Sequence, residues 1–259
     1  MSTILFQVEG SIARIKLNRP EVKNAFNDAL VAELADALKA VEKSPVVRVV
    51  ILSGEGDFFC AGADLNWMKS FVGASRKKNE EDARRLAKLL QHLNELKKPT
   101  IAQVHGAAIG GGVGLLAACD VVVAQENTVF ALAEVKLGLI PAVISPFVIA
   151  RMGGSASRRY FLTGERITAD VALRTGLIQE SVPAEKLQAT TEEIARHLIT
   201  SGPEAVKHAK ELVRKVSPQA AAGVQAYTVR KIASLRAGAE AQEGMKAFLE
   251  KRKPSWNVS

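Results

Sequence analysis

Glycine dominates one short segment of this sequence. Residues 106–114 contain five glycines, three of them consecutive at 110–112. The segment follows the apolar run Thr100–Val104 and leads into another apolar run that is compatible with a helix. The first N–H groups of a helix have no partner within it and lie at the positive end of its dipole. Such a turn could bind an anion or stabilise an oxyanion that develops during a reaction.

A second loop of small residues, 57–65, follows the β-branched run 46–52. Ligand crevices in strand–helix folds lie at strand ends of this kind. This loop could supply one backbone donor and Gly111 a second. Two donors aimed at one oxygen fit acyl transfer or the enolate of a thioester. An ordinary loop without function is the alternative for residues 57–65.

Glu134 is the carboxylate that merits attention, because the residues before it are apolar. Low-dielectric surroundings raise the proton affinity of a carboxylate, which can then act as a general acid and base near neutral pH. A structural acid paired with Lys136 is the alternative. A second alternative is a dinucleotide site, since residues 112–117 match G-x-G-x-x-G/A and Glu134 follows at about the expected distance. That fingerprint, however, normally closes the first strand of a βαβ unit.

The sequence lacks the residues that other classes of catalytic site require. The four histidines show no metal-binding spacing, and His105 is interpreted as a structural residue beside the glycine turn. There is no phosphate-binding P-loop and no nucleophile elbow. Cys60 and Cys119 cannot form a disulfide framework, which favours a reducing, cytoplasmic setting. No secretory signal is recognised at the start of the sequence.

Hydrophobic periodicity predicts the elements that position these residues. Expected strands are 4–8, 12–17, 46–52, 100–104 and 121–124, and expected helices are 28–43, 80–96, about 155–162, 185–198, 203–216 and 219–251. Strands and helices mix up to Pro183, and only helices are expected after it. We therefore expect an α/β core over residues 1–183 and a helical region over 184–259.

The composition is that of an ordinary globular protein, with 47% hydrophobic and 24% charged residues in 259. No apolar stretch is long enough to span a membrane. The net charge of +8 favours a polyanionic ligand, which could be nucleic acid, an anionic surface or a small molecule with several phosphates. The basic run Lys251, Arg252 and Lys253 is interpreted as a solvated helix end.

The motifs together resemble the crotonase superfamily, the enoyl-CoA hydratases and isomerases. They occur in family order over nearly the whole chain, at residues 17–20, 59–65, 106–112, 119–120, 134–141 and 243–252. The resemblance implies a spiral of repeated ββα turns with a C-terminal helical trimerisation region, in homotrimers that usually pair into homohexamers. It also implies a coenzyme A thioester as substrate, with no separate cofactor and no metal.

Carried over residue by residue, the resemblance assigns the oxyanion hole to the N–H groups of Ala63 and Gly111, and the acid/base to Glu134. It assigns contacts with coenzyme A to a further set of residues: Lys23, Ala25, Ala61, Asp64, Leu65, Gly110 and Lys251. Lys251 matches a lysine that reaches a CoA phosphate, often across a subunit boundary. Such an enzyme would serve fatty acid metabolism or leucine degradation.

One position departs from the family pattern, because Gly114 stands where the first hydratase glutamate is expected. Residues 64–69 and 142–146 resemble the branch of methylglutaconyl-CoA and isohexenylglutaconyl-CoA hydratases. We therefore expect an enoyl-CoA hydratase for a branched or carboxylated acyl group. A Δ3,Δ2-enoyl-CoA isomerase with a single glutamate is the alternative. An RNA-binding protein, against which the low aromatic content argues, and a non-catalytic crotonase-fold protein are alternatives of another class.

Overall fold

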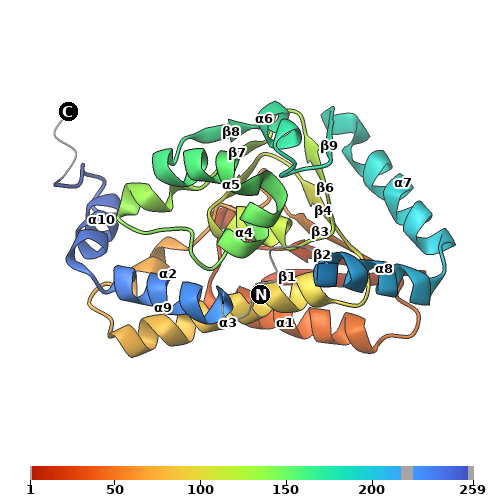
Figure 1. Ribbon diagram of the computed structural model, residues 1–259, viewed down its shortest axis with the longest axis horizontal. Helices are drawn as coiled ribbons and strands as arrows, with labels where there is room; N and C mark the ends of the chain where they lie inside the picture. Colours follow the sequence, from red (N-terminus) through yellow and green to blue (C-terminus); the bar gives the residue numbers. More distant parts are fainter. Residues whose placement is uncertain (1, 217–223, 256–259) are drawn as a thin grey trace.

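The computed structural model describes residues 2–216 and 224–255, which form two β-sheets surrounded by helices (Figure 1). The larger sheet has the strand order β1-β2-β3-β4-β6-β9. Its strands are β1 (Ile4–Glu9), β2 (Ile12–Leu17), β3 (Val49–Gly54), β4 (Thr100–Val104), β6 (Val121–Gln125) and β9 (Glu180–Val182). The β1–β2 pair is antiparallel and the other neighbours are parallel. The smaller sheet has the order β5-β7-β8, formed by β5 (Ala107–Ile109), β7 (Val129–Ala131) and β8 (Arg166–Thr168).

The helices connect and cover these strands. In the first half of the chain they are α1 (Asp28–Lys43), α2 (Leu65–Lys69), α3 (Arg76–Glu95) and α4 (Gly111–Ala117). In the second half they are α5 (Ser145–Thr163), α6 (Ala169–Arg174), α7 (Leu187–Thr200), α8 (Pro203–Val216), α9 (Val224–Arg236) and α10 (Ala239–Leu249). Short 3-10 helices occur at η1 (Pro20–Val22), η2 (Ala133–Leu137) and η3 (Ala184–Lys186). None of the described helices is long and apolar enough to cross a membrane.

The larger sheet is buried on both faces, as the β-branched strands require. Side chains alternate along a strand, so Val50 and Leu52 join the main core, in which α1 and α3 also pack. Val49 and Ile51 point the other way, into a second cluster that includes Leu187 and residues of the same helix, α7. Helix α7 therefore covers the face opposite α1 and α3.

The chain winds as a spiral of ββα turns, as the resemblance implied. One turn consists of β4, β5 and α4, and the next consists of β6, β7 and η2, which leads to α5. In each turn the first strand joins the larger sheet and the second joins the smaller one. The turn before them has β3 in the larger sheet, and its Cys60 forms an isolated parallel bridge to Ala108 of β5. Three successive turns are thus stacked in register.

Most predicted elements are confirmed, and the strands 12–17 and 100–104 and the helices 28–43 and 203–216 have the predicted bounds. The prediction of one helix over 219–251 was wrong, because the chain breaks between α9 and α10. Gly238 adopts an extended conformation there and caps α10. Residues 219–223 of that prediction lie outside the described part of the chain. Helix α5 begins ten residues before the predicted 155, with Pro146 in its first turn.

The helical C-terminal segment packs on the rest of the chain. Helix α9 lies along α3, and α10 contacts α2 and η2 (Figure 1). Val229 and Ile232 of α9 are part of the main core. The division into 1–183 and 184–259 stays an interpretation. Helix α7 belongs to the second part of that division, but it packs on the larger sheet, whose strands belong to the first part.

Candidate active site

Three turns of the spiral bring their loops to one edge of the smaller sheet. Cys60 bridges Ala108, and Ala108 pairs with Phe130 in the parallel register of β5 and β7. Ala63 and Gly111 each follow their bridged residue by three positions, and Glu134 follows Phe130 by four. Because the strands are parallel, these similar spacings of three, three and four positions bring the residues to the same end of the strands. The three residues predicted to act together are therefore assembled by the register of the sheet.

These residues line a cavity of about 860 Å3. The predicted substrate-binding residues that line it are Lys23, Ala25, Ala61, Ala63, Asp64, Leu65, Gly110 and Gly111, together with Glu134. Lys251 does not line the cavity in this single chain, although its neighbour Arg252 does. The contact of Lys251 with coenzyme A stays a prediction. Nε2 of His105 donates to the Gly56 carbonyl at 2.7 Å, which fits a structural residue.

The N–H groups of Ala63 and Gly111 have no acceptor in the part of the chain that the structure describes. Nearby N–H groups are engaged: Ala61 donates to the Lys23 carbonyl at 2.9 Å, and Asp64 donates to that of Phe26 at 2.9 Å. The two loops lie close, since a Cβ added to Gly62 would sit 4.0 Å from the Gly111 nitrogen. Gly111 is also the first residue of α4, where the helix dipole is positive. Two free donors thus lie beside one another in the cavity wall.

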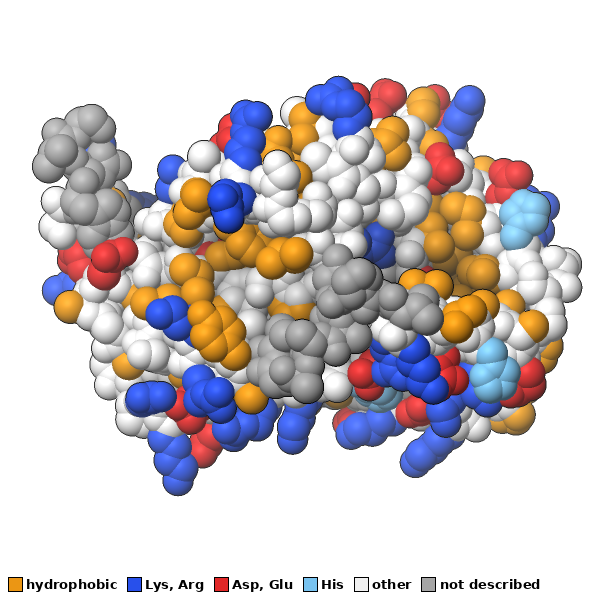
Figure 2. Space-filling model, viewed as in Figure 1, with side chains coloured by type: hydrophobic (Ala, Val, Ile, Leu, Met, Phe, Trp, Pro, Cys, Tyr) orange, Lys and Arg blue, Asp and Glu red, His pale blue; other side chains and the backbone are white. Residues whose placement is uncertain are grey.

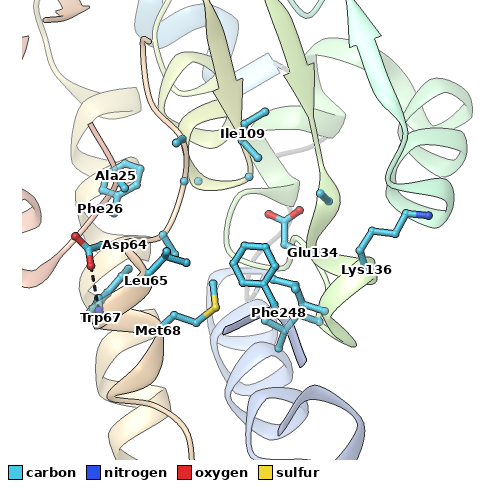
Figure 3. A pocket seen from close by; sticks show the side chains of 18 of the residues that line it. Ala25, Phe26, Asp64, Leu65, Trp67, Met68, Ile109, Glu134, Lys136 and Phe248 are labelled. Atoms are coloured by element: carbon cyan, nitrogen blue, oxygen red, sulfur yellow. Dashed lines mark hydrogen bonds between the residues drawn. The ribbon is translucent and has the colours of Figure 1, made fainter. Parts of the chain in front are cut away.

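The carboxylate of Glu134 points into the cavity, whereas the Lys136 side chain points the other way (Figure 3). The pairing of Glu134 with Lys136 considered from the sequence is therefore absent among the described ion pairs. Oε2 of Glu134 is buried without a hydrogen-bond partner in the described residues. Burial raises the pKa of Glu134 to about 7. Half of the Glu134 side chains would be ionised near neutral pH, as a group that both takes and gives a proton requires.

Gly110 allows the Glu134 carboxylate to approach the backbone. Its φ of +50° lies in the region that favours glycine, and an added Cβ would meet Oε1 of Glu134 at 3.0 Å. The Gly110 N–H is itself engaged, donating to the Ala131 carbonyl at 2.8 Å. Gly110 therefore positions the carboxylate rather than supplying a donor to the cavity.

The early loop is held against residues 61–64 by a buried ion pair. Arg19 contacts Asp64 at 2.7 Å, and Asp64 also accepts from the N–H groups of Asn66 and Trp67 at the start of α2. Burial alone would raise the pKa of Asp64, but the Arg19 guanidinium and these N–H groups outweigh it and hold that pKa below its usual value. The Asp64 side chain thus fixes the loop. The exposed Lys23 lies over the Phe58 ring at 4.7 Å from its centroid and remains at the cavity mouth.

Comparison with known proteins decides the family. The family model described as enoyl-CoA hydratase/isomerase matches residues 7–259. The chain belongs to this family. It is 33% identical over 257 residues to 2,3-dehydroadipyl-CoA hydratase of Escherichia coli, and 34% identical over 259 residues to 1,2-epoxyphenylacetyl-CoA isomerase of the same organism. The first match covers 99% of each chain, and the second covers 99% of this chain and 98% of the relative. The crystal structure of an enoyl-CoA hydratase from Mycobacterium avium is 34% identical, with a TM-score of 0.87 and 99% of both chains covered.

Within this enoyl-CoA hydratase/isomerase, the absence of a carboxylate at Gly114 is a consequence of packing. A Cβ at Gly114 would lie 2.1 Å from Cγ2 of Ile144, which directly precedes α5 and lines the cavity. Ile144 therefore occupies the space that a side chain at position 114 would need. The dinucleotide interpretation also fails, because Gly112 and Gly114 are buried inside α4 and cannot reach a pyrophosphate.

The wall that α3, α9 and α10 contribute to the cavity was not predicted from the sequence. This wall includes Leu86, Ile232, Arg236 and Phe248. The helical periodicity indicated that α9 and α10 each have an apolar face, but it did not indicate which part of the chain that face contacts. The described residues contain no group of three or more His, Cys, Asp or Glu that could hold a metal ion.

Proposed function

We propose that this enzyme reversibly hydrates the double bond of a 2-enoyl-CoA thioester with a branched or carboxylated acyl group. One observation carries the proposal: a buried carboxylate with a pKa of about 7, Glu134, shares a cavity with the free N–H groups of Ala63 and Gly111. This combination fits a reaction in which a proton moves while a thioester oxygen becomes negative.

In the proposed mechanism the thioester carbonyl accepts hydrogen bonds from Ala63 and Gly111. The Glu134 carboxylate takes a proton from a water molecule, and the oxygen of that water bonds to C3. The electrons of the C2–C3 double bond move onto the thioester as an enolate. The two N–H groups stabilise that oxyanion. The enolate then collapses, and C2 takes the proton from Glu134. Water is added across the bond and Glu134 returns to its starting form.

The cavity is suited to a coenzyme A ester. Lys23 and Lys69 are cationic side chains in its lining that have no ion pair among the described residues. They could meet the phosphates of coenzyme A, together with the proposed contact of Lys251. Ala61, Asp64 and Leu65 would lie along the adenine and pantetheine, and Ala25 would also contact coenzyme A. Coenzyme A is part of the substrate, so we propose no separate cofactor.

The preference for a carboxylated acyl group is supported by two observations. Cationic Arg236 lies in the same lining as the apolar Leu86 and Ile232. The Escherichia coli relative is named for a dehydroadipyl thioester. The residue pattern at 64–69 and 142–146 favours a substrate that resembles methylglutaconyl-CoA. Such a substrate would place the enzyme in leucine degradation.

Replacement of Glu134 by glutamine tests the assignment. We expect kcat for hydration to fall by about 10²–10⁴-fold, since acid–base groups contribute that much, while the CoA ester still binds. Hydration is followed by the loss of the enoyl absorbance, and binding by calorimetry with a saturated acyl-CoA. Lys136→Gln, next in space along η2 but pointing away, is the matched control and should retain most activity. Near-normal turnover of Glu134→Gln would refute the role of Glu134.

The isomerase alternative has its own support, because Gly114 leaves no second carboxylate to hold water and one relative is an isomerase. A single carboxylate could move one proton from C2 to C4 of a 3-enoyl thioester. The two reactions are distinguished by incubating 2-enoyl and 3-enoyl thioesters in ¹⁸O-labelled water. Hydration introduces the label into the product, whereas isomerisation leaves it in the solvent.

A further inference from the structure

Three side chains meet at one wall of the cavity: Trp67 of α2, Phe71 in the turn after it, and Arg236 at the end of α9. Trp67 packs edge-on against Phe71, with ring centroids 5.7 Å apart at 81°. The Arg236 guanidinium lies over the same Phe71 ring, 4.8 Å from its centroid. Trp67 and Arg236 both line the cavity. Phe71 thus holds an indole and a guanidinium close together.

Arg236 is fixed in place but not saturated. One of its nitrogens, Nη1, contacts Oδ2 of Asp82 on α3 at 2.8 Å. This is the only hydrogen bond that its guanidinium makes within the described residues, out of five N–H groups. The Arg236 side chain is 18% exposed, whereas that of Asp82 is 3% exposed. Donors of a pre-positioned cation therefore remain for a ligand in the cavity.

Trp67 has a donor that is buried and unused. Its Nε1 has no hydrogen-bond partner in the described part of the chain. An unsatisfied buried donor costs about 1–3 kcal/mol, so a site that keeps one commonly has an acceptor in its bound state. The backbone of Trp67 is held separately, through the hydrogen bond of its N–H to Asp64 at 3.2 Å. Because Trp67 lines the cavity, a bound molecule is the candidate source of the missing acceptor.

The charge around Phe71 favours an anion. Two cations lie over its ring, Arg236 and Lys78, the latter at 5.4 Å from the centroid. Asp82 is the acid that contacts Arg236, and it also contacts Arg85 at 3.3 Å. Burial raises the pKa of Asp82, although both arginines lower it in part. Asp82 thus contacts two arginines, of which Arg85 also pairs with Asp28 at 2.8 Å, and Arg236 is left with Asp82 as its single carboxylate partner among the described residues.

We propose that Arg236 and the Trp67 indole bind a carboxylate at the distal end of the acyl chain. This inference rests on the proposed function, in which the thioester carbonyl lies at Ala63 and Gly111 and coenzyme A extends past the exposed Lys23. The wall of Trp67 and Arg236 is then left for the acyl group. Arg236 and Trp67 are specificity-determining residues in this proposal, and they take no part in the proton transfer.

The test compares binding of two saturated thioesters of equal chain length, glutaryl-CoA and pentanoyl-CoA, which have no double bond to hydrate. By calorimetry, the wild type should bind glutaryl-CoA about tenfold or more tightly than pentanoyl-CoA, because hydrogen bonds between charged groups are among the stronger ones. Arg236→Met should abolish this preference and leave the affinity for pentanoyl-CoA nearly unchanged. Trp67→Phe, which removes only the indole N–H and part of the ring, should reduce the preference severalfold.

Two further variants separate the role in binding from a role in folding. Lys231→Met removes an exposed cation from the same helix and should keep the preference. The double variant Arg236→Met with Asp82→Asn avoids a lone buried carboxylate, and it should fold and lack the preference. Equal loss of affinity for both thioesters, or no preference in the wild type, would overturn the proposal. If the hydratase assignment is wrong but this proposal is right, the preference for glutaryl-CoA would persist although the protein hydrates no enoyl-CoA.

Discussion

Glu134 differs from the other glutamates of the chain in how it is buried. Its carboxylate lies in a cavity wall against Gly110, and Oε2 has no partner among the described residues. Surface carboxylates such as Glu243 are held ionised by arginine, and the pKa of Glu243 falls to about 2 through its hydrogen bond with Arg252. Burial without a cation has the opposite effect and raises the pKa of Glu134 to about 7. The environment of one residue therefore prepares it for proton transfer.

The activity should consequently depend on pH around neutrality. Because the carboxylate form of Glu134 takes the proton from water, kcat/KM for hydration should rise with pH and level off above a pKa of about 7. A pH–rate profile from pH 5.5 to 8.5 measures this dependence. A profile that is flat across this range would show that Glu134 is ionised throughout and that burial does not control it.

The same shift predicts how stability changes with pH. Glu134 has a higher pKa folded than the usual 4.5, so between pH 4.5 and 7 the folded state binds more protons than the unfolded state. Its contribution to stability is therefore lost as pH rises through this window. Glu134→Gln should gain about 3 kcal/mol relative to the wild type between pH 4.5 and 8, at 1.36 kcal/mol per pKa unit. Urea denaturation at both pH values checks this, and a constant difference would contradict it.

At the scale of elements, the contact between α4 and α5 determines which carboxylates the site can hold. Gly114 of α4 and Ile144 at the start of α5 fill one space between them. Val143 and Ile144, the two residues before α5, also line the cavity. The single-carboxylate site is thus a property of a helix pair rather than of one position.

This packing predicts a strong coupling between the two residues. Gly114→Ala should destabilise the protein by about 1–3 kcal/mol, because its Cβ would overlap Ile144. The same substitution in an Ile144→Gly background should cost little, since Cγ2 and Cβ of Ile144 are then absent. Chemical denaturation of the four proteins of this cycle gives the coupling free energy. Gly154→Ala in α5, where nothing lies within 4 Å, is the control and should be nearly neutral.

At the scale of the whole molecule, apolar side chains remain exposed away from the cavity. Figure 2 shows them along the right-hand side of one face, where Figure 1 places α7 and α8. Ion pairs of Lys210 with Asp120 and of Arg214 with Glu95 orient α8 on the core. Leu212 and Val213 of the same helix are nonetheless 60% and 68% exposed. Side chains of this kind commonly lie in contacts between subunits.

We therefore expect the chain to form the homotrimers or homohexamers that its family resemblance implied, with α8 at a contact between copies. Sedimentation velocity at micromolar concentration should show a trimer or a multiple of it. Leu212→Asp combined with Val213→Asp should shift the distribution toward smaller species, while circular dichroism shows that the helices persist. A wild-type monomer, or an assembly unaffected by these two charges, would contradict the expectation.

The sequence by itself determined the elements whose pattern is local. The alternation in β2, the apolar stripe of α1 and the glycines of 110–112 each depend on residues a few positions apart, and they led to the right elements. The family resemblance of the sequence added Ala63 to Gly111 and Glu134, and all three line one cavity. Contacts between distant segments were decided only by the tertiary structure. These are the register that aligns the three loops, the filling of the Gly114 space by Ile144, and the meeting of Trp67 with Arg236. Periodicity shows that a face is buried, but which neighbour covers it depends on how the layers of the spiral stack.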